Sequence, residues 1–289
     1  MPSPGLRPDD ATVSLLLTNG IGLVQTYGDN QYECGELQNF NLAYEPRWGQ
    51  LKSITRPAPG NHEYATGCPA GVAASDDESA DLGRTMTPDE ASGAGYYEYF
   101  AGRTPGHPGN YSYDYQGWHF AVINTSFATV PGGAAAVRDW LRVDLAANRD
   151  KLCTVVYGHH PYKATRSPFS GTPDMATIWP TMVLEDVEMY ISGHNHSYER
   201  GLPMRTMGNV DEDWGPGDGD DGHGGVRWVV AGTGGRSRIA FTGASPSSSV
   251  IRIGGRYGIF KIVPYADRAI TAFKGTDGVT SDRNSWDCH

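Results

Sequence analysis

Side chains that commonly bind metals follow abrupt turns in four separate segments of this chain. They are Asp29, Asn61, His159, and His194 with His196. A carboxylate, an amide oxygen and imidazoles together suit borderline transition metals such as Zn, Fe or Mn. A calcium cage built from oxygens and a zinc site built from sulfurs both fit this mixture less well. The pattern therefore predicts a transition-metal site.

Each of the four segments follows a short run that reads as a buried strand. The runs are IGLVQTY (21–27), ITRPAP (54–59), LCTVVYG (152–158) and VEMYIS (187–192). Open α/β sheets build their sites where strands end at their carboxyl edge, so these four endings can meet in one crevice. Glycines before Asp29, Asn61 and His194 relieve the steric cost of a sharp turn after the strand.

The rest of the chain predicts the elements that must carry these turns. We expect helices over 9–19, 134–149 and about 174–185, with a further helix that Pro46 stops. YSYDY and WHFAVINT read as a hairpin, and VRWVVAG, YGIFKIV and AITAFKG as late strands. Helices alternate with strands early and hairpins come late, which favours one mixed α/β domain over 1–289. Within it, 1–8 would be non-regular, while 66–95 and 201–225 would be surface loops.

The bulk composition excludes several classes of protein. A net charge of −10 and a pI near 5.3 argue against a nucleic-acid partner, which needs a basic surface. No apolar run reaches the length of a transmembrane helix, so we expect no membrane partner. The N-terminal MPSPGLRPDD lacks the apolar core of a signal peptide. The protein is then either cytoplasmic or begins downstream of a leader.

Four motifs resemble a known family when they are taken in order. GDNQY (28–32), GNHEY (60–64), YGHHPY (157–162) and GHNHSYER (193–200) resemble the signature blocks of the calcineurin-like metallophosphoesterase superfamily. The first and last blocks are similar to its purple acid phosphatase branch and to related bacterial phosphatases. One block alone is weak evidence, but four in the right order, each after an expected strand, are specific.

The resemblance implies a fold and a set of ligands. The fold would be a four-layer α/β/β/α sandwich of two mixed sheets, and its first strand is lacking here. Asp29 would bridge two metal ions, with Tyr32 and His196 completing the first site. The second site would be completed by Asn61, His159 and His194. A tyrosine ligand implies Fe(III) at the first site, beside divalent Zn, Fe or Mn at the second.

The implied activity is acid-phosphatase-like hydrolysis of a small phosphate monoester by a metal-bound hydroxide. His62 would stabilise charge on the phosphate or protonate the leaving alkoxide, and His160 is the second candidate for that role. Glu199 and Arg200 would orient the loop that carries His194 and His196. A phosphodiesterase acting at the same site is the alternative, since the same metals serve both reactions.

The family's first strand, which ends in an aspartate ligand, has no counterpart here. Residues 1–8 contain three prolines, and proline blocks a central strand. Asp9 and Asp10 read better as capping residues of the first helix than as that ligand. We favour an N-terminally truncated form of a secreted or periplasmic enzyme. The rival is a catalytically impaired relative that only binds metal.

Four cysteines permit two disulfides without requiring them. Cys34 lies six residues after Gly28 and Cys68 lies six residues after His62, so a disulfide between them is possible if both loops leave neighbouring strands. Cys153 begins a buried strand, and we expect it to pack there as a small apolar side chain.

Overall fold

The computed structural model describes residues 8–32, 34–64, 92–165, 171–205 and 225–288. Its helical elements are α1 Pro8–Thr18, α2 Leu37–Asn39, η1 Phe40–Tyr44, η2 Trp48–Ile54, η3 Asn61–Glu63, α4 Ala94–Tyr99, η5 Phe127–Thr129, α5 Gly133–Ala147, η6 Pro173–Thr177 and α6 Trp179–Leu184. Its strands are β1 Val24–Tyr27, β2 Thr55–Ala58, β3 Tyr111–Tyr115, β4 Trp118–Val122, β5 Thr154–Tyr157, β6 Met189–Ser192, β7 Tyr198–Gly201, β8 Arg227–Ala231, β9 Ser249–Ile253, β10 Gly258–Pro264, β11 Arg268–Gly275 and β12 Thr280–Asp287.

The larger sheet has seven strands in the order β3-β4-β5-β6-β8-β7-β9. Its centre, β4-β5-β6-β8, is parallel, and antiparallel pairs complete both edges. Central parallel strands are covered on both faces, which explains their continuous apolar runs. Within β5, Val155 and Tyr157 join the cluster on one face and Val156 joins the cluster on the other.

The second β-layer consists of two separate ladders. β1 pairs with β2 in parallel, while β10, β11 and β12 form an antiparallel meander. No ladder joins β1 to β10 among the described residues, so both are edge strands. The sheet is therefore interrupted between β1 and β10, as expected for a sandwich that lacks its first strand.

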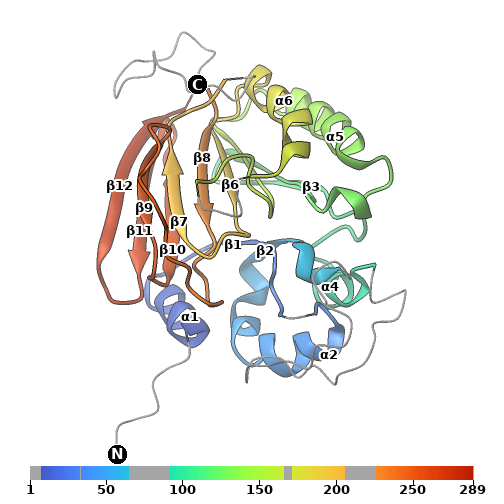
Figure 1. The fold of residues 1–289 in the computed structure, drawn as a ribbon. Coiled ribbons are helices and arrows are strands. Elements are labelled where there is room, and N and C mark those ends of the chain that lie inside the picture. Colours follow the sequence, from blue (N-terminus) through green and yellow to red (C-terminus); the bar gives the residue numbers. More distant parts are fainter. Residues whose placement is uncertain (1–7, 33, 65–91, 166–170, 206–224, 289) are drawn as a thin grey trace, which may run out of the picture.

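α5 and α6 lie against the seven-stranded sheet, and α1 lies beside one end of the other β-layer (Figure 1). Val137 and Leu141 of α5 and Met182 of α6 pack on the seven-stranded sheet. Val13 and Leu16 of α1 pack instead near β1 and β10. Each buried aliphatic side chain of this kind contributes about 1.5–3 kcal/mol. The molecule is thus the predicted four-layer α/β/β/α sandwich.

Several predicted elements have different boundaries in the structure. The expected helix over 174–185 is divided into η6 and α6. The loop predicted over 66–95 lies mostly outside the described residues, although α4 begins at Ala94. The same is true of 201–225, from which Met204 forms a β-bridge with Val226. In the described part of the chain, no helix combines the length and apolarity needed to cross a bilayer.

Candidate metal centre

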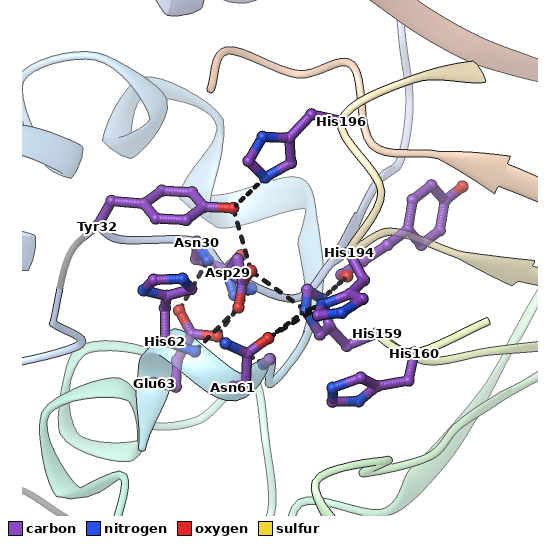
Figure 2. Close-up of polar contacts among 12 residues, drawn as sticks. Asp29, Asn30, Tyr32, Asn61, His62, Glu63, His159, His160, His194 and His196 are labelled. Carbon is purple, nitrogen blue, oxygen red and sulfur yellow. Dashed lines mark hydrogen bonds and ion pairs between the residues drawn. The ribbon is translucent and has the colours of Figure 1, made fainter. Parts of the chain in front are cut away.

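The four predicted segments lie together at one edge of the β-layers (Figure 2). Asp29 follows β1, Asn61 follows β2, His159 follows β5 and His194 follows β6. Because β1 runs parallel to β2 and β5 runs parallel to β6, the members of each pair end at a common edge. The topology therefore gathers side chains that are up to 165 positions apart in the sequence.

The turns after these strands hold the backbone in sparsely populated conformations. Asp29 has a φ of 50° and His194 a φ of 62°, both in the left-handed region that non-glycine residues rarely adopt. Gly28 has a φ of 81°, and a Cβ atom there would collide with the His159 ring. Such conformations cost about 1–3 kcal/mol each and gather at functional sites. The strained backbone at these turns thus brings the side chains of Asp29, His159 and His194 close together.

Four side chains form what we call the Asn61 cluster: Asp29, Asn61, His159 and His194. His159 Nε2 lies 2.9 Å from Asn61 Oδ1, 3.1 Å from His194 Nδ1 and 3.1 Å from Asp29 Oδ2. His194 Nδ1 also lies 3.1 Å from Asn61 Oδ1. Atoms bound roughly 2.1 Å from one metal ion and at right angles to each other are separated by about 3 Å. The spacing therefore fits a shared cation.

The protonation of His159 supports the same conclusion. Its Nδ1 lies 2.8 Å from the carbonyl oxygen of Tyr27, which can only accept, so Nδ1 carries the hydrogen. Nε2 then offers a lone pair to the cluster. Burial lowers the pKa of His159, but the ion pair with Asp29 outweighs it and raises the pKa overall. When no cation is bound, Nε2 can carry a second proton and donate it to the neighbouring oxygens of the cluster. A metal ion would take the place of that proton and bind the Nε2 lone pair.

Asp29 also belongs to a second group, the Tyr32 cluster of Asp29, Tyr32 and His196. The Tyr32 hydroxyl donates to Asp29 Oδ2 at 3.0 Å and lies 3.2 Å from His196 Nε2. Burial and the neighbouring Asp29 carboxylate raise the pKa of Tyr32 well above its ordinary value. Burial lowers the pKa of His196 to about 4. The phenol and the imidazole are therefore neutral, and both can serve as metal ligands.

Asp9 and Asp10 do not complete the Tyr32 cluster. Both lie in the first turn of α1, where acidic side chains interact favourably with the helix dipole. Their carboxylates pair with the Arg47 guanidinium at 3.1 and 3.2 Å. Asp29 is accordingly the one carboxylate in the Tyr32 cluster as built from the described residues.

The two candidate catalytic histidines lie on opposite sides of the centre. The His62 ring packs on the Tyr32 ring with centroids 4.4 Å apart, and its backbone N–H donates to Asp29 Oδ1 at 3.0 Å. The His160 ring packs near His194, with centroids 4.6 Å apart. Burial lowers the pKa of His160 to about 2, with His159 adding to the effect. His160 is therefore a neutral imidazole.

Thr125, which the sequence did not single out, fixes the tautomer of His160. Its hydroxyl oxygen accepts the backbone N–H groups of His159 and His160, at 3.2 and 2.8 Å. The Thr125 hydroxyl can then donate its own hydrogen to His160 Nδ1, which lies 2.9 Å away. The remaining ring hydrogen of His160 is on Nε2, where it can donate to an anion.

Glu63 is a second residue that sequence reasoning missed. Its fully buried carboxylate accepts N–H groups from both the β1 turn and the β2 turn. The donors are Asp29 at 2.9 Å, Asn30 at 2.7 Å, Gln31 at 3.2 Å and Gly60 at 2.6 Å. Burial, followed by repulsion from Asp29, raises the pKa of Glu63 to about 7. The motif GNHEY contained the signal, because a charged residue next to a buried turn must find partners.

Arg236 provides a cation beside the Tyr32 cluster. Its guanidinium lies over the Tyr32 ring, with Cζ 4.7 Å from the centroid. It lines the same cavity as Asp29, His194 and His196. A cation in this place can attract an anionic substrate. Two glycines precede it in GTGGR (232–236), a pattern compatible with a turn beside a ligand.

Glu199 and Arg200 have partners other than the expected histidine loop. The Glu199 carboxylate accepts hydrogen bonds from the backbone N–H and the hydroxyl of Thr165, a residue in the segment that follows His160. Arg200 forms a two-pronged ion pair with Asp282 on β12, at 2.8 and 2.6 Å. These residues anchor β7 to its surroundings, and their effect on His194 and His196 is indirect.

The prediction for Cys153 was wrong, because this residue forms a disulfide with Cys288. Their Cα atoms are 5.2 Å apart and their positions differ by 135 residues, a pairing that local sequence cannot reveal. Cys34 is also disulfide-bonded. Its expected partner, Cys68, lies outside the described residues.

Comparisons with solved structures agree with this architecture. A purple acid phosphatase from yellow lupin (Lupinus luteus) superposes with a TM-score of 0.69 at 17% identity, over 96% of this chain and 49% of that one. GAP50, the anchor in the inner membrane complex of Plasmodium, superposes with a TM-score of 0.61 at 13% identity, over 99% of this chain and 86% of that one. PhoD superposes with a TM-score of 0.61 at 10% identity, over 95% of this chain and 66% of that one. The chain thus spans about half the length of the lupin enzyme.

Sequence comparison identifies the family. A search of curated proteins gives no significant match. The family model for calcineurin-like phosphoesterases, however, matches residues 22–198, which include all four segments of the centre. Because that match covers more than half of the chain, the protein belongs to the calcineurin-like phosphoesterase family.

Proposed function

We propose that this protein hydrolyses phosphate monoesters with two metal ions held by the Asn61 and Tyr32 clusters. The observation that carries the proposal is the meeting of His159 Nε2, His194 Nδ1 and Asn61 Oδ1 within about 3 Å of one another, with Asp29 Oδ2 3.1 Å from His159 Nε2. Three of these atoms are neutral acceptors or lone pairs, and they would repel one another without a cation or a proton between them. Metal-dependent phosphoester hydrolysis is the activity that the family supports.

The donor sets suggest which ions are held. Imidazole and amide donors in the Asn61 cluster suit divalent Zn, Fe or Mn, and a phenol in the Tyr32 cluster suits Fe(III). When bound, the two ions supply positive charge for the phosphoryl oxygens and acidify water. Asp29 lies between the clusters and would serve both ions.

The protein's own side chains then orient and protonate the substrate. His160 presents its Nε2 hydrogen as a neutral donor to a phosphoryl oxygen. His62, packed on Tyr32, lies on the other side and can protonate the leaving alkoxide. The Arg236 guanidinium favours a monoester, since a monoester dianion carries twice the charge of a diester.

A second candidate function is metal binding with little or no turnover. The single carboxylate of the Tyr32 cluster favours it, because this site would hold its ion less tightly than a site with two carboxylates. One structural neighbour, GAP50, is described as the anchor in the inner membrane complex of Plasmodium. The fold alone therefore does not decide between catalysis and a structural role.

We also propose an oxidising location, either secreted or periplasmic. Cys34, Cys153 and Cys288 are all disulfide-bonded. Disulfides persist in secreted and periplasmic proteins and are rare where thiols are kept reduced.

The test compares an aryl phosphate with an aryl phosphodiester, each assayed with metal-free protein and after addition of Fe, Zn or Mn. The proposal expects metal-dependent turnover that prefers the monoester. A preference for the diester would establish the phosphodiesterase alternative. Stoichiometric metal binding without turnover of either substrate would establish the impaired relative.

A further inference from the structure

A second group of side chains that can bind a metal lies at the opposite end of β5 and β6 from the candidate metal centre. It consists of Cys153, Glu188 and Cys288. Cys153 immediately precedes β5, Glu188 immediately precedes β6, and Cys288 follows β12. Because β5 and β6 are parallel, their first residues meet at one edge, as their last residues meet at the other. The two sulfurs and a carboxylate oxygen all lie within 4.8 Å of one another.

Backbone hydrogen bonds hold each of the three residues to a neighbouring element. The Cys153 carbonyl oxygen accepts from the His119 N–H of β4 at 2.8 Å, and the Cys288 N–H donates to the turn between β10 and β11 at 2.9 Å. The Glu188 N–H donates to the Thr154 carbonyl oxygen at 3.1 Å, and the Thr154 N–H donates back to the Glu188 carboxylate at 2.6 Å. The sheets therefore keep the three side chains together when the bond between the sulfurs is opened.

The burial and charge of the group suit a cation. Cys153 and Glu188 are buried, whereas Cys288 is half-buried. Two thiolates and a carboxylate would carry three negative charges, which a buried site holds only beside compensating cations. A divalent ion would leave one negative charge. Arg227 is placed to offset it, since its N–H donates to the Glu188 carbonyl oxygen at 3.1 Å and its guanidinium Cζ lies 5.4 Å from the centroid of the Trp286 ring.

The oxidation state of the two cysteines decides whether the group has thiolates to offer. In the structure the sulfurs are joined in the Cys153–Cys288 disulfide. A dithiol reductant opens this bond when its thiolate attacks Cys288 Sγ, the more exposed sulfur, and Cys153 leaves as a thiolate. The second thiol of the reductant then releases Cys288, so that two electrons and two protons pass to the protein and the reductant becomes a disulfide. Every newly made chain also passes through the dithiol state before its disulfide forms.

The geometry of the group fits a thiophilic ion. Zinc lies about 2.3 Å from a thiolate and about 2.0–2.2 Å from a carboxylate oxygen, and its sites are tetrahedral. Two thiolates on one tetrahedral ion are then about 3.8 Å apart, which is within the span of the group. Sulfur ligands select Zn or a similarly soft ion over Mg or Ca. Water can occupy the fourth position.

We propose that Cys153, Cys288 and Glu188 form a site for Zn²⁺ or a similar thiophilic ion whenever the two cysteines are thiols. Binding displaces both thiol protons, and the ion then joins β5 to the segment after β12 as the disulfide does in the oxidised protein. The ion and the disulfide are thus alternative cross-links at one place. Hydrolysis depends on the other edge of the sheet, so this proposal and the proposed function can fail separately.

The test titrates Cd²⁺ into protein that was reduced with a phosphine and then freed of the phosphine without oxygen. The ultraviolet sulfur-to-cadmium charge-transfer band reports thiolate ligands alone, so an ion in the candidate metal centre does not contribute. The reduced Cys153→Ser/Cys288→Ser protein retains Cys34 and serves as the control. We expect the reduced intact protein to give the band of one more Cd²⁺ per chain than the control, and the oxidised protein to give none. Equal bands in the reduced intact protein and the control would overturn the proposal.

Two single substitutions test the carboxylate ligand. Glu188→Gln should weaken Cd²⁺ binding to the reduced protein by about tenfold or more. Glu185→Gln is the matched control, because Glu185 pairs with Arg149 instead, and we expect its affinity to be unchanged. Unchanged affinity in Glu188→Gln would overturn the three-ligand site.

A stability measurement decides the question if reduction unfolds the protein. Zn²⁺ added to the reduced intact protein should then restore the native circular dichroism and raise Tm. The same addition should not do so in the Cys153→Ser/Cys288→Ser protein. Failure of Zn²⁺ to restore the reduced intact protein, or equal recovery of both proteins, would contradict the proposal.

Discussion

The carboxylate of Glu63 and the backbone of Asp29 are joined by a hydrogen bond of 2.9 Å. Through it, a residue after β2 holds the turn after β1, in which Asp29 adopts a φ of 50°. Gly60 donates to the same carboxylate oxygen at 2.6 Å. Glu63 therefore sets the relative position of Asp29 and Asn61 without facing the cluster itself.

We predict that Glu63→Gln weakens metal binding by about 10–100-fold, the usual effect of losing an outer partner. An amide has one acceptor oxygen where the carboxylate has two, so some of the N–H groups lose their bond. The unfolding free energy should fall by about 2–4 kcal/mol. Metal affinity is measured by calorimetry and stability by urea titration. Glu188→Gln is the control, since Glu188 binds the Thr154 N–H away from the centre. An unchanged metal affinity in Glu63→Gln would show that Glu63 does not position Asp29 and Asn61 for metal binding.

His62→Ala should retain metal but lose rate, by about 10²–10⁴-fold for a proton donor. The imidazole packs on Tyr32, and its loss leaves every atom of the Asn61 cluster in place. Rates with aryl phosphates of different leaving-group pKa sharpen the test. The loss should be largest for the poorest leaving group, which most needs a proton. Full rate in His62→Ala would exclude this role.

Arg236→Ala should lower kcat/KM for an aryl phosphate by about tenfold and change that for a diester much less. The reason is that the guanidinium beside Tyr32 acts on substrate charge, and tenfold corresponds to about 1.4 kcal/mol. Arg238→Ala is the matched control, because Arg238 binds the carbonyl oxygen of Gly255 instead. Equal losses for both ester classes would show that Arg236 does not select the monoester.

His119 should make stability depend on pH. It is 2% exposed and lies 2.9 Å from Asp114 and 2.8 Å from Asp144. Burial lowers its pKa, but the two carboxylates together raise the pKa above 6.5. The stabilisation is therefore fully present below about pH 6.5 and is lost as pH rises through the folded-state pKa. Urea unfolding from about pH 6 to about pH 9 should show this decline, and His119→Gln should flatten it. An unchanged slope in His119→Gln would contradict the assignment.

Removing the Cys153–Cys288 disulfide by a double Ser substitution should cost about 4–5 kcal/mol, since it closes a loop longer than 100 residues. Cys153 precedes β5 and His159 follows it, so the disulfide and the metal centre lie at opposite ends of one strand. We expect lower stability with kcat unchanged at low temperature. Loss of kcat in fully folded protein would show that the disulfide also shapes the site.

The sequence was enough to predict that four candidate ligands lie together, because each of them directly follows an apolar strand. In a parallel arrangement, strand ends at one edge must meet, so local patterns were enough to gather Asp29, Asn61, His159 and His194. Glu63 and Thr125 were missed because both act through backbone N–H groups, which leave no spacing pattern. Their partners became visible only when the turns were placed in space.

Two of the strands that were missed, β7 and β12, depend on distant partners. β7 has the sequence YERG, and its Arg200 is stabilised by Asp282, which lies 82 positions away. β12 has the sequence TSDRNSWD, which offers few apolar residues and no clear alternation. It is held by pairing with β11 and by burial of Trp286. Such polar strands follow from tertiary pairing rather than from local preference.

The central claim is that the Asn61 cluster binds a metal that hydrolysis requires. The most direct measurement is metal content per chain, with aryl phosphate turnover, in the intact protein and in His194→Ala. We predict at least one bound ion and metal-dependent turnover in the intact protein, with both lost together in folded His194→Ala. Turnover that survives in His194→Ala, or in protein freed of metal by chelation, would contradict the claim.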